Sequence, residues 1–196
     1  MILDTENEMF SPLRADRGTV CMLEFAEFRA GDKVLDLGCG YGLVGIYAAK
    51  IVGEENVVMS DISRREVEVS LANAAKNGVG RIRAFASDGF SEIPPMKFDA
   101  ILSNPPYHVD FSVPKHFIEK SFYRLHLGGR LYMVTRRKLW YQNRIAAVFG
   151  GVRVEEKEGY YIFIAEKRSP KPPARTEKKT NGLSKKLARK EQHKKR

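Results

Sequence analysis

Residues 33–52 read KVLDLGCGYGLVGIYAAKIV, and this stretch decides the fold that the sequence predicts. A β-type apolar run at 33–37 leads directly into a turn with three glycines, and a helix-like pattern follows from Leu43. A strand, a glycine turn and a helix in this order form the first unit of a parallel α/β sheet. The turn after this strand is therefore a candidate ligand site.

The same alternation continues along the chain. Further strands are expected at 56–60, 81–87, 98–103 and 130–135, with helices at 62–78 and 112–127. This rhythm predicts a doubly wound parallel sheet with helices on both faces. Residues 152–167 hold two β-type runs around Glu158-Gly159 and predict an antiparallel hairpin. The predicted fold class is α/β, a Rossmann-like, doubly wound, seven-stranded mixed sheet with a C-terminal antiparallel hairpin.

The excess positive charge lies at the C-terminal end. The formal net charge is +10, but residues 167–196 hold 13 Lys/Arg and 2 Asp/Glu, a net of +11, which leaves −1 for the other 166 residues. We expect one domain over residues 1–168, beginning with a short N-terminal lead segment, and a disordered basic tail over 169–196. A polybasic segment gains affinity for a polyanion by releasing counterions, which favours nucleic acid over a role in solubility.

Cysteine content and hydropathy narrow the class of protein further. Cys21 and Cys39 are too few for a disulfide framework, and no Cys/His cluster has zinc spacing. The first ten residues are acidic and do not form a signal peptide, and no apolar run has membrane-spanning length. The tail also has few large apolar residues that would insert into a membrane surface. We expect a cytoplasmic protein with no metal site and no membrane contact.

The glycine turn permits more than one ligand. Gly38, Gly40 and Gly42 would let the backbone approach a ligand closely. Residues 40–45 also match the dinucleotide pattern GxGxxG, and Asp61 follows about 20 residues later, as that pattern expects. Glycines that serve only tight helix–strand packing are the remaining explanation.

Asp36 favours a cofactor that has no phosphate at this position. It stands ahead of the first glycine, where its carboxylate would repel a pyrophosphate. S-adenosylmethionine fits: Asp36 would hold the ammonium of its amino acid part, and Asp61 would hold its ribose hydroxyls. Asp88 is placed to accept from the adenine amine, and a helix or turn cap is an equal explanation for it.

Four motifs, in this order and spacing, resemble those of class I S-adenosylmethionine-dependent methyltransferases: DLGCGYG, MSDIS, ASDGF and SNPPY. The resemblance covers roughly residues 30–167. It implies that NPPY belongs to an enzyme that methylates a planar nitrogen, namely adenine N6, guanine N2 or the side-chain amide of glutamine. The cofactor-binding residues are then expected to be Asp36, Gly38, Gly40, Gly42, Asp61, Asp88 and Asn104.

Asn104, Pro105 and Tyr107 are the catalytic candidates. An amine conjugated to a ring or carbonyl is a poor nucleophile because its lone pair is delocalised. The side-chain carbonyl of Asn104 and the backbone carbonyl of Pro105 would accept its N–H groups and hold it toward the methyl donor. Tyr107 would stack on the flat target. The alternative is a simple strand stop made by two prolines.

Three segments narrow the target. Residues 10–18, residues 103–108 and the stretch from 125–141 through 148–150 to the hairpin at 156–165 resemble ribosomal small-subunit RNA guanine-N2 methyltransferases, with the closest likeness to single-domain relatives. By this resemblance, Phe10, Asp16 and Gly18 shape the cofactor or target pocket, and an N-terminal packing segment is an equal explanation. His108 is expected to be a pocket-wall residue. The cations of residues 135–138 either contact phosphates or start a helix.

We therefore expect methyl transfer to an exocyclic base amine of RNA, most specifically guanine N2 of ribosomal RNA. Ribosomal RNA or the small ribosomal subunit would bind through the pocket and the basic tail. Adenine-N6 methylation of RNA or DNA and glutamine-N5 methylation of a protein stay open. So does a non-catalytic RNA- or ribosome-binding factor that retains the cofactor fold. A dehydrogenase is a distant alternative.

Overall fold

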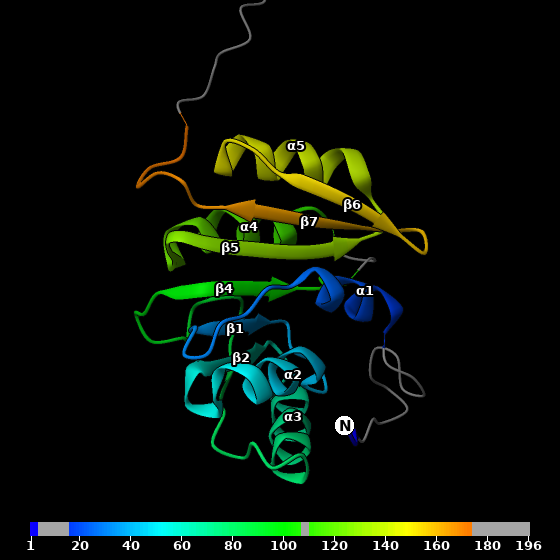
Figure 1. Cartoon of the computed structure of the whole chain (residues 1–196), viewed down its shortest axis with the longest axis vertical. Helices are drawn as coiled ribbons and strands as arrows, with labels where there is room; N and C mark the ends of the chain where they lie inside the picture. Colours follow the sequence, from blue (N-terminus) through cyan, green and yellow to red (C-terminus); the bar gives the residue numbers. More distant parts are fainter. Residues whose placement is uncertain (4–15, 107–109, 174–196) are drawn as a thin grey trace, which may run out of the picture.

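The computed structural model of the chain describes residues 1–3, 16–106 and 110–173. Its centre is a seven-stranded sheet in the order β3-β2-β1-β4-β5-β7-β6 (Figure 1). The strands are β1 (Val34–Leu37), β2 (Val57–Asp61), β3 (Arg83–Ala86), β4 (Phe98–Ser103), β5 (Leu125–Thr135), β6 (Arg153–Lys157) and β7 (Tyr160–Glu166). Strands β1 to β5 pair in parallel, and β7 pairs antiparallel with both β5 and β6. The predicted mixed sheet is confirmed.

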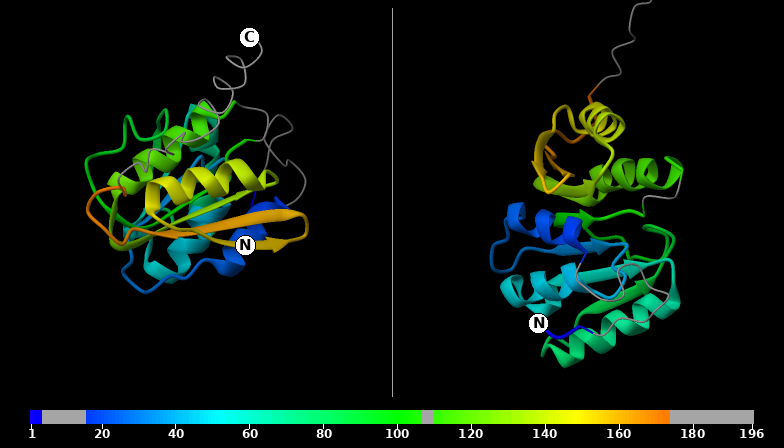
Figure 2. Two further views of the ribbon diagram at one scale, coloured as in Figure 1. Left: turned by 90° about the horizontal axis from the view of Figure 1, so that it is seen from above. Right: turned by 90° about the vertical axis from the view of Figure 1, so that its right-hand side faces the viewer.

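Helices cover both faces of this sheet. They are α1 (Arg17–Phe25), α2 (Leu43–Val52), α3 (Arg64–Lys76), α4 (Ser112–Arg124) and α5 (Lys138–Phe149), with a 3-10 turn η1 (Glu54–Asn56). Helices α1, α2 and α3 pack on one face, while α4 and α5 pack on the other (Figures 1 and 2). In the described part of the chain, no helix is long and apolar enough to cross a membrane.

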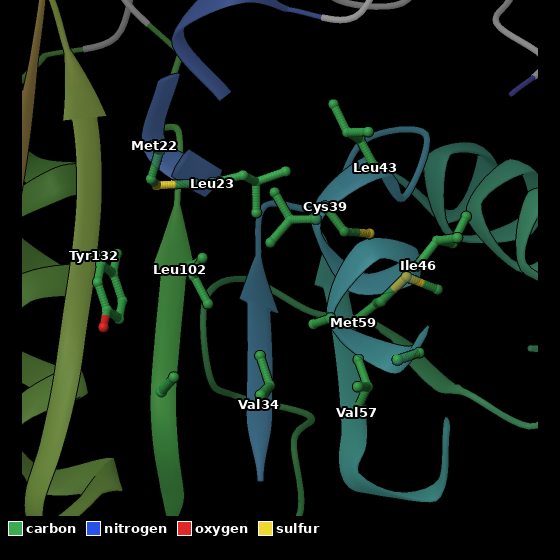
Figure 3. Close-up of a cluster of buried hydrophobic side chains, with 14 of the residues drawn as sticks. Met22, Leu23, Val34, Cys39, Leu43, Ile46, Val57, Met59, Leu102 and Tyr132 are labelled. Atoms are coloured by element: carbon green, nitrogen blue, oxygen red, sulfur yellow. The ribbon is translucent and has the colours of Figure 1, made fainter. Parts of the chain in front are cut away.

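The central strands are buried on both sides, which explains their nearly continuous apolar sequences. Along β1, for example, Val34 contributes to the core under α1 and α2, whereas Leu35 contributes to the core under α4 and α5. Figure 3 shows the first of these cores, in which Met22 of α1 and Ile46 of α2 pack against strand residues. Both layers hold the carboxyl ends of β1 and β4 rigidly in place.

Local signals fix the predicted boundaries of several elements. Helix α3 begins after Ser63, whose hydroxyl accepts from the Glu66 N–H at 3.3 Å, as an N-cap residue does. The hairpin between β6 and β7 turns at Glu158 and Gly159, with φ of 51° and 76°. Two residues with positive φ make a turn whose twist suits a two-residue hairpin.

The boundary between α4 and β5 corrects the sequence prediction. The helix expected over 112–127 ends at Arg124, and β5 begins at Leu125 rather than at residue 130. Leu125 is fully buried and pairs with Phe98 of β4. Its burial against the sheet outweighs helix propensity in this stretch, because tertiary packing decides between two weakly different local preferences.

Both ends of the domain are more structured than the short lead segment and the tail that the sequence predicts. Asp16 caps a helix, α1, that the sequence prediction left out, and α1 packs against β5 and β7. Because β7 is antiparallel to β5, its last residue, Glu166, pairs with Arg130 at the edge where the parallel strands begin. The buried Lys167 ammonium then donates to the Leu125 carbonyl at 2.9 Å. Most of the expected tail, residues 174–196, lies outside the described residues.

Candidate active site

The candidate site lies where the carboxyl ends of β1 and β4 meet. In the strand order, β2 and β3 extend to one side of β1, and β4 and β5 extend to the other. Ligands of doubly wound sheets bind in the crevice at this kind of switch point. The Ser103 hydroxyl ties the two strand ends together by donating to the Leu37 carbonyl at 2.8 Å. Figure 2, right, looks onto this edge of the sheet.

The glycine loop follows β1, and its glycines lie in two kinds of surroundings, open space and close packing. A Cβ added at Gly38, whose φ is +78°, would meet no protein atom within 4 Å. Gly42, with φ of +89°, behaves differently, because a Cβ there would lie 3.0 Å from Ser70 Cβ. The Gly38 and Cys39 N–H groups both donate to the Ser60 carbonyl of β2. Packing thus explains Gly42, whereas Gly38 is explained by its positive φ, and the space beside it is open to a ligand.

Asp36 lies beneath this loop rather than on its surface. Its side chain is 2% exposed, and Oδ2 accepts from the Gly45 N–H at 2.9 Å. Gly45 must be small, since a Cβ would lie 2.6 Å from the Met59 side chain. Burial raises the pKa of the Asp36 carboxyl to about 7, although the Gly45 hydrogen bond offsets part of that effect. Asp36 therefore anchors α2 and is poised between its two protonation states at neutral pH.

Asp61, the last residue of β2, contacts the glycine loop. Its Oδ2 accepts from the Gly40 N–H and its Oδ1 from the Ser63 N–H, both at 3.0 Å. The next residue, Ile62, is a large apolar side chain that is 74% exposed. An acidic acceptor and an apolar surface thus stand side by side at the end of β2. Sequence analysis named Asp61 but missed Ile62, although an apolar residue directly after a strand-end carboxylate is a visible signal.

Asp88 stands farther along the same edge, after β3. The Ser87 N–H donates to the Asp61 carbonyl at 2.7 Å, which joins the ends of β2 and β3. The Asp88 side chain is exposed and lines a cavity of about 500 Å³ together with His116, Lys120 and other residues of α4. The structure thus keeps Asp88 accessible at the edge that carries Asp61.

Asn104, the first residue after β4, has its side-chain amide oriented by two partners from the N-terminal segment. Its Nδ2 donates to Asp16 Oδ1 at 2.7 Å and to Thr19 Oγ1 at 2.9 Å. An ionised carboxylate only accepts hydrogen bonds, so the amide nitrogen, not the oxygen, must face Asp16. The side-chain oxygen of Asn104 lies in the same carboxamide plane and consequently points away from Asp16.

The same network reaches the glycine loop. Asp16 Oδ1 also accepts from the N–H and hydroxyl of Thr19, at 2.8 and 3.1 Å. The Asp16 N–H donates to the Tyr41 hydroxyl at 3.2 Å. The Tyr41 carbonyl in turn accepts from Asn73 Nδ2 of α3 at 2.9 Å. Helix α1, the glycine loop and the end of β4 therefore form one connected structure, of which sequence analysis named Asp16 but not Thr19 or Tyr41.

Gly18 lets α1 approach the hairpin. A Cβ at this position would lie 2.8 Å from two ring atoms of Tyr160 and 3.1 Å from Asp16 Oδ1. Of the other candidates, Pro105 is buried and Pro106 is exposed. Phe10, Tyr107 and His108 lie outside the described residues, so their expected roles stay predictions.

A further cavity of about 530 Å³ lies at the opposite edge of the sheet. Its lining includes Glu27, Arg130, Tyr132 and Glu166, and Arg130 forms ion pairs with both glutamates. None of the predicted site residues lines this cavity. In the described part of the chain, no group of three or more His, Cys, Asp or Glu side chains has an arrangement that would hold a metal ion.

The chain is similar to one protein family and to several known proteins. The sequence profile of the family described as Methyltransferase small domain matches residues 1–164. Uncharacterized protein YbxB of Bacillus subtilis is 32% identical over 169 residues, which cover 83% of this chain and 84% of that protein. Ribosomal RNA small subunit methyltransferase C of Hahella chejuensis is 35% identical over 150 residues, covering 74% of this chain and 43% of that protein.

Among solved structures, the 16S rRNA N2 methyltransferase RsmC of Thermus thermophilus, in complex with AdoMet and guanosine, superposes with a TM-score of 0.74. It is 28% identical, and the match covers 82% of this chain and 45% of that one. The chain thus spans less than half the length of these two methyltransferases and most of the length of YbxB.

Proposed function

This chain belongs to the methyltransferase small domain family, and we propose that it transfers a methyl group from S-adenosylmethionine to an exocyclic base amine of RNA, specifically N2 of guanine in ribosomal RNA. The observation that carries this proposal is the fixed orientation of the Asn104 amide, whose nitrogen is held by Asp16 and Thr19. This arrangement fixes the direction of the side-chain oxygen, which is the acceptor offered to the target amine.

The residues around the glycine loop fit S-adenosylmethionine. Gly38 leaves room beside the backbone, and Asp61 offers carboxylate oxygens to ribose hydroxyls. The exposed Ile62 offers an apolar surface to the adenine ring, and Asp88 an acceptor to its amine. Beneath the loop, Asp36 would favour the amino acid ammonium, whose positive charge stabilises the ionised carboxylate.

When bound, S-adenosylmethionine supplies an electrophilic methyl group on a sulfonium. The protein's own part is to hold a weak nucleophile in line with that group. The Asn104 side-chain oxygen accepts one N–H of the target amine, and the Pro105 carbonyl accepts the other. Both acceptors stabilise the positive charge that develops on the nitrogen and raise the fraction of reactive geometries. Because Asn104 is held before the target arrives, little reorganisation is needed during the reaction.

Several observations support RNA, and guanine, as the target. Relatives that share 35% and 28% of their aligned residues with this chain are named as ribosomal RNA methyltransferases, and the second carries guanosine in its structure. The net charge of +11 in residues 167–196 also suits a polyanion. A base inside a duplex must leave its stack to reach Asn104, so an unpaired or readily flipped guanine is the expected target.

The test is methyl transfer from radiolabelled S-adenosylmethionine to ribosomal RNA, supplied naked and as small subunits, followed by nucleoside identification. We expect N2-methylguanosine, and N6-methyladenosine would keep the chemistry but replace the base. Label in a glutamine-bearing protein and not in RNA would overturn the RNA assignment. Asn104→Ala should abolish turnover and keep the cofactor Kd, whereas normal turnover in this variant would refute the role of Asn104.

A further inference from the structure

A stack of three planar groups stands beside the candidate active site. The Phe111 and Trp140 rings stack with centroids 4.3 Å apart and an interplanar angle of 21°. The Arg137 guanidinium carbon lies over the Phe111 ring, 5.1 Å from its centroid. Phe111 immediately precedes α4, whereas Arg137 and Trp140 lie at the start of α5. We call Phe111, Arg137 and Trp140 the aromatic–arginine stack.

This stack lies at the same edge of the sheet as Asn104. Strands β4 and β5 are parallel neighbours, and Ser103 pairs with Met133. Asn104 directly follows β4, and Arg137 follows the end of β5 at Thr135 by two residues. Both residues therefore leave adjacent strands in the same direction, toward the viewer in Figure 2, right.

Arg137 is the second of three consecutive cations, and its neighbours are engaged differently. Arg136 donates to the Tyr160 hydroxyl at 3.0 Å, and Lys138 forms an ion pair with Glu156 at 4.0 Å. Within residues 1–3, 16–106 and 110–173, Arg137 has no carboxylate partner at ion-pair distance. The nearby Asp110 carboxylate accepts from the Ser112 N–H instead.

Stacking uses the face of a guanidinium and leaves its edge available. Contact with the Phe111 ring restrains the Arg137 side chain, whose N–H donors lie around the rim of the guanidinium plane. An arginine restrained in this way is suited to a bidentate contact with phosphate, because less side-chain freedom is lost on binding. The positive charge of an exposed arginine that has no carboxylate partner is also not neutralised and attracts an anion.

We infer that Arg137, held by Phe111 and Trp140, binds a phosphate of the RNA strand next to the target nucleotide and so positions the target base at Asn104. This inference rests on the proposed function, since it assigns the RNA backbone contact of the same site. Arg137 is a positioning residue here, and the chemistry at the amine stays with Asn104. Its loss should therefore raise KM and leave kcat little changed.

Trp140 makes a direct experiment possible, because it is the only tryptophan of the chain. The full chain is titrated with a short single-stranded RNA that carries guanosine at its centre, and tryptophan fluorescence is followed at several salt concentrations. We expect the fluorescence to change on binding. Arg137→Gln should weaken binding about tenfold at low salt and reduce the slope of log K against log salt by about 0.7 to 0.9.

Two variants control for general charge and for folding. Arg29→Gln removes an exposed arginine before β1, at the opposite edge of the sheet, and should leave both the affinity and the salt slope unchanged. Arg137→Lys keeps the charge but loses the planar fork, so its affinity should lie between those of the original chain and Arg137→Gln. All variants should retain the melting temperature and the affinity for S-adenosylmethionine.

The outcomes separate this inference from the proposed function. If the original chain methylates RNA while Arg137→Gln keeps its RNA affinity, salt slope and KM, the proposed function stands and the inference is wrong. If no RNA is methylated but RNA binding depends on Arg137, the backbone contact stands and the proposed function fails. A fluorescence change caused by a glutamine-bearing peptide, with none caused by RNA, would overturn the inference in favour of a protein partner.

Discussion

Asn104 and Asp16 lie 88 positions apart in the chain, yet the amide nitrogen of the first donates to the carboxylate of the second at 2.7 Å. The contact ties the segment before the sheet to the end of β4. Thr19 completes it, since its hydroxyl donates to Asp16 and accepts from Asn104. We therefore propose the three-residue network Asp16–Thr19–Asn104, rather than Asn104 alone, as the functional unit.

Thr19→Val should lower kcat by about tenfold while leaving the cofactor Kd unchanged, because Asn104 loses one of the two acceptors that orient its amide. Thr19→Ser retains the hydroxyl and should restore the rate, which makes it the matched control. Steady-state kinetics and cofactor titration measure both variants. A kcat of Thr19→Val equal to that of the original chain would contradict this role of the Thr19 hydroxyl.

Gly18→Ala should destabilise the domain despite placing a better helix former in α1. Helix propensity favours alanine by about 1 kcal/mol, but its Cβ would lie 2.8 Å from the buried Tyr160 ring, and overpacking costs typically 1–3 kcal/mol. We expect a lower melting temperature, by a few degrees, in thermal unfolding.

Gly151→Ala provides the control for this substitution. A Cβ at Gly151 would meet nothing within 4 Å, so its melting temperature should stay close to that of the original chain. An equal drop for both alanine variants would show that the Tyr160 contact is not the cause.

Asp36→Asn should change how stability depends on pH. The folded-state pKa of about 7 lies above the ordinary value of 3.8, so the folded protein holds this proton more tightly than the unfolded chain does. The resulting stabilisation is complete below pH 3.8 and is lost as the pH rises through 7. The difference between the two pKa values corresponds to at most about 4 kcal/mol.

Urea unfolding at pH 5 and pH 8 measures this effect. The free energy of unfolding of the original chain should fall relative to that of Asp36→Asn between these two pH values, because the amide never ionises. The variant should also bind S-adenosylmethionine more weakly at pH 8. Parallel stability curves for the two proteins would show that Asp36 does not change its protonation in this range.

Removal of residues 169–196 should weaken the affinity for long ribosomal RNA and flatten its salt dependence. The deleted segment holds 11 Lys/Arg residues, and each phosphate contact contributes to the slope of log K against log salt. Filter binding at several salt concentrations measures the slope. An unchanged slope would show that this segment makes no phosphate contact.

The sheet could be predicted from the sequence because most of its strands have a recognisable local pattern. Buried parallel strands are short apolar runs between glycines and polar turns, and β4 and α2 lie at the predicted residues. The start of β5 could not be predicted, because Leu125, His126 and Leu127 suit the end of a helix as well as a strand. Only the burial of Leu125 against β4 decides between the two.

The candidate site was predictable where a residue stands next to its strand end. Asp61, Asn104 and the glycine loop follow from their place after β2, β4 and β1. Asp16 could be predicted as a site residue only from the family resemblance, and Thr19 could not be predicted, because contacts between distant segments leave no local pattern in the sequence. Helix α1 has only nine residues and a glycine in its first turn, so its helical signal is weak.

The antiparallel direction of β7 has a consequence for the size of the substrate. The chain leaves the sheet after Glu166, at the edge where β4 begins, whereas Asn104 follows the end of β4. At about 3.3 Å per residue, the six residues of β4 alone separate these edges by roughly 20 Å. The basic segment and the target pocket thus start from opposite ends of the domain. A single RNA that contacted both starting points would have to span this height of the sheet.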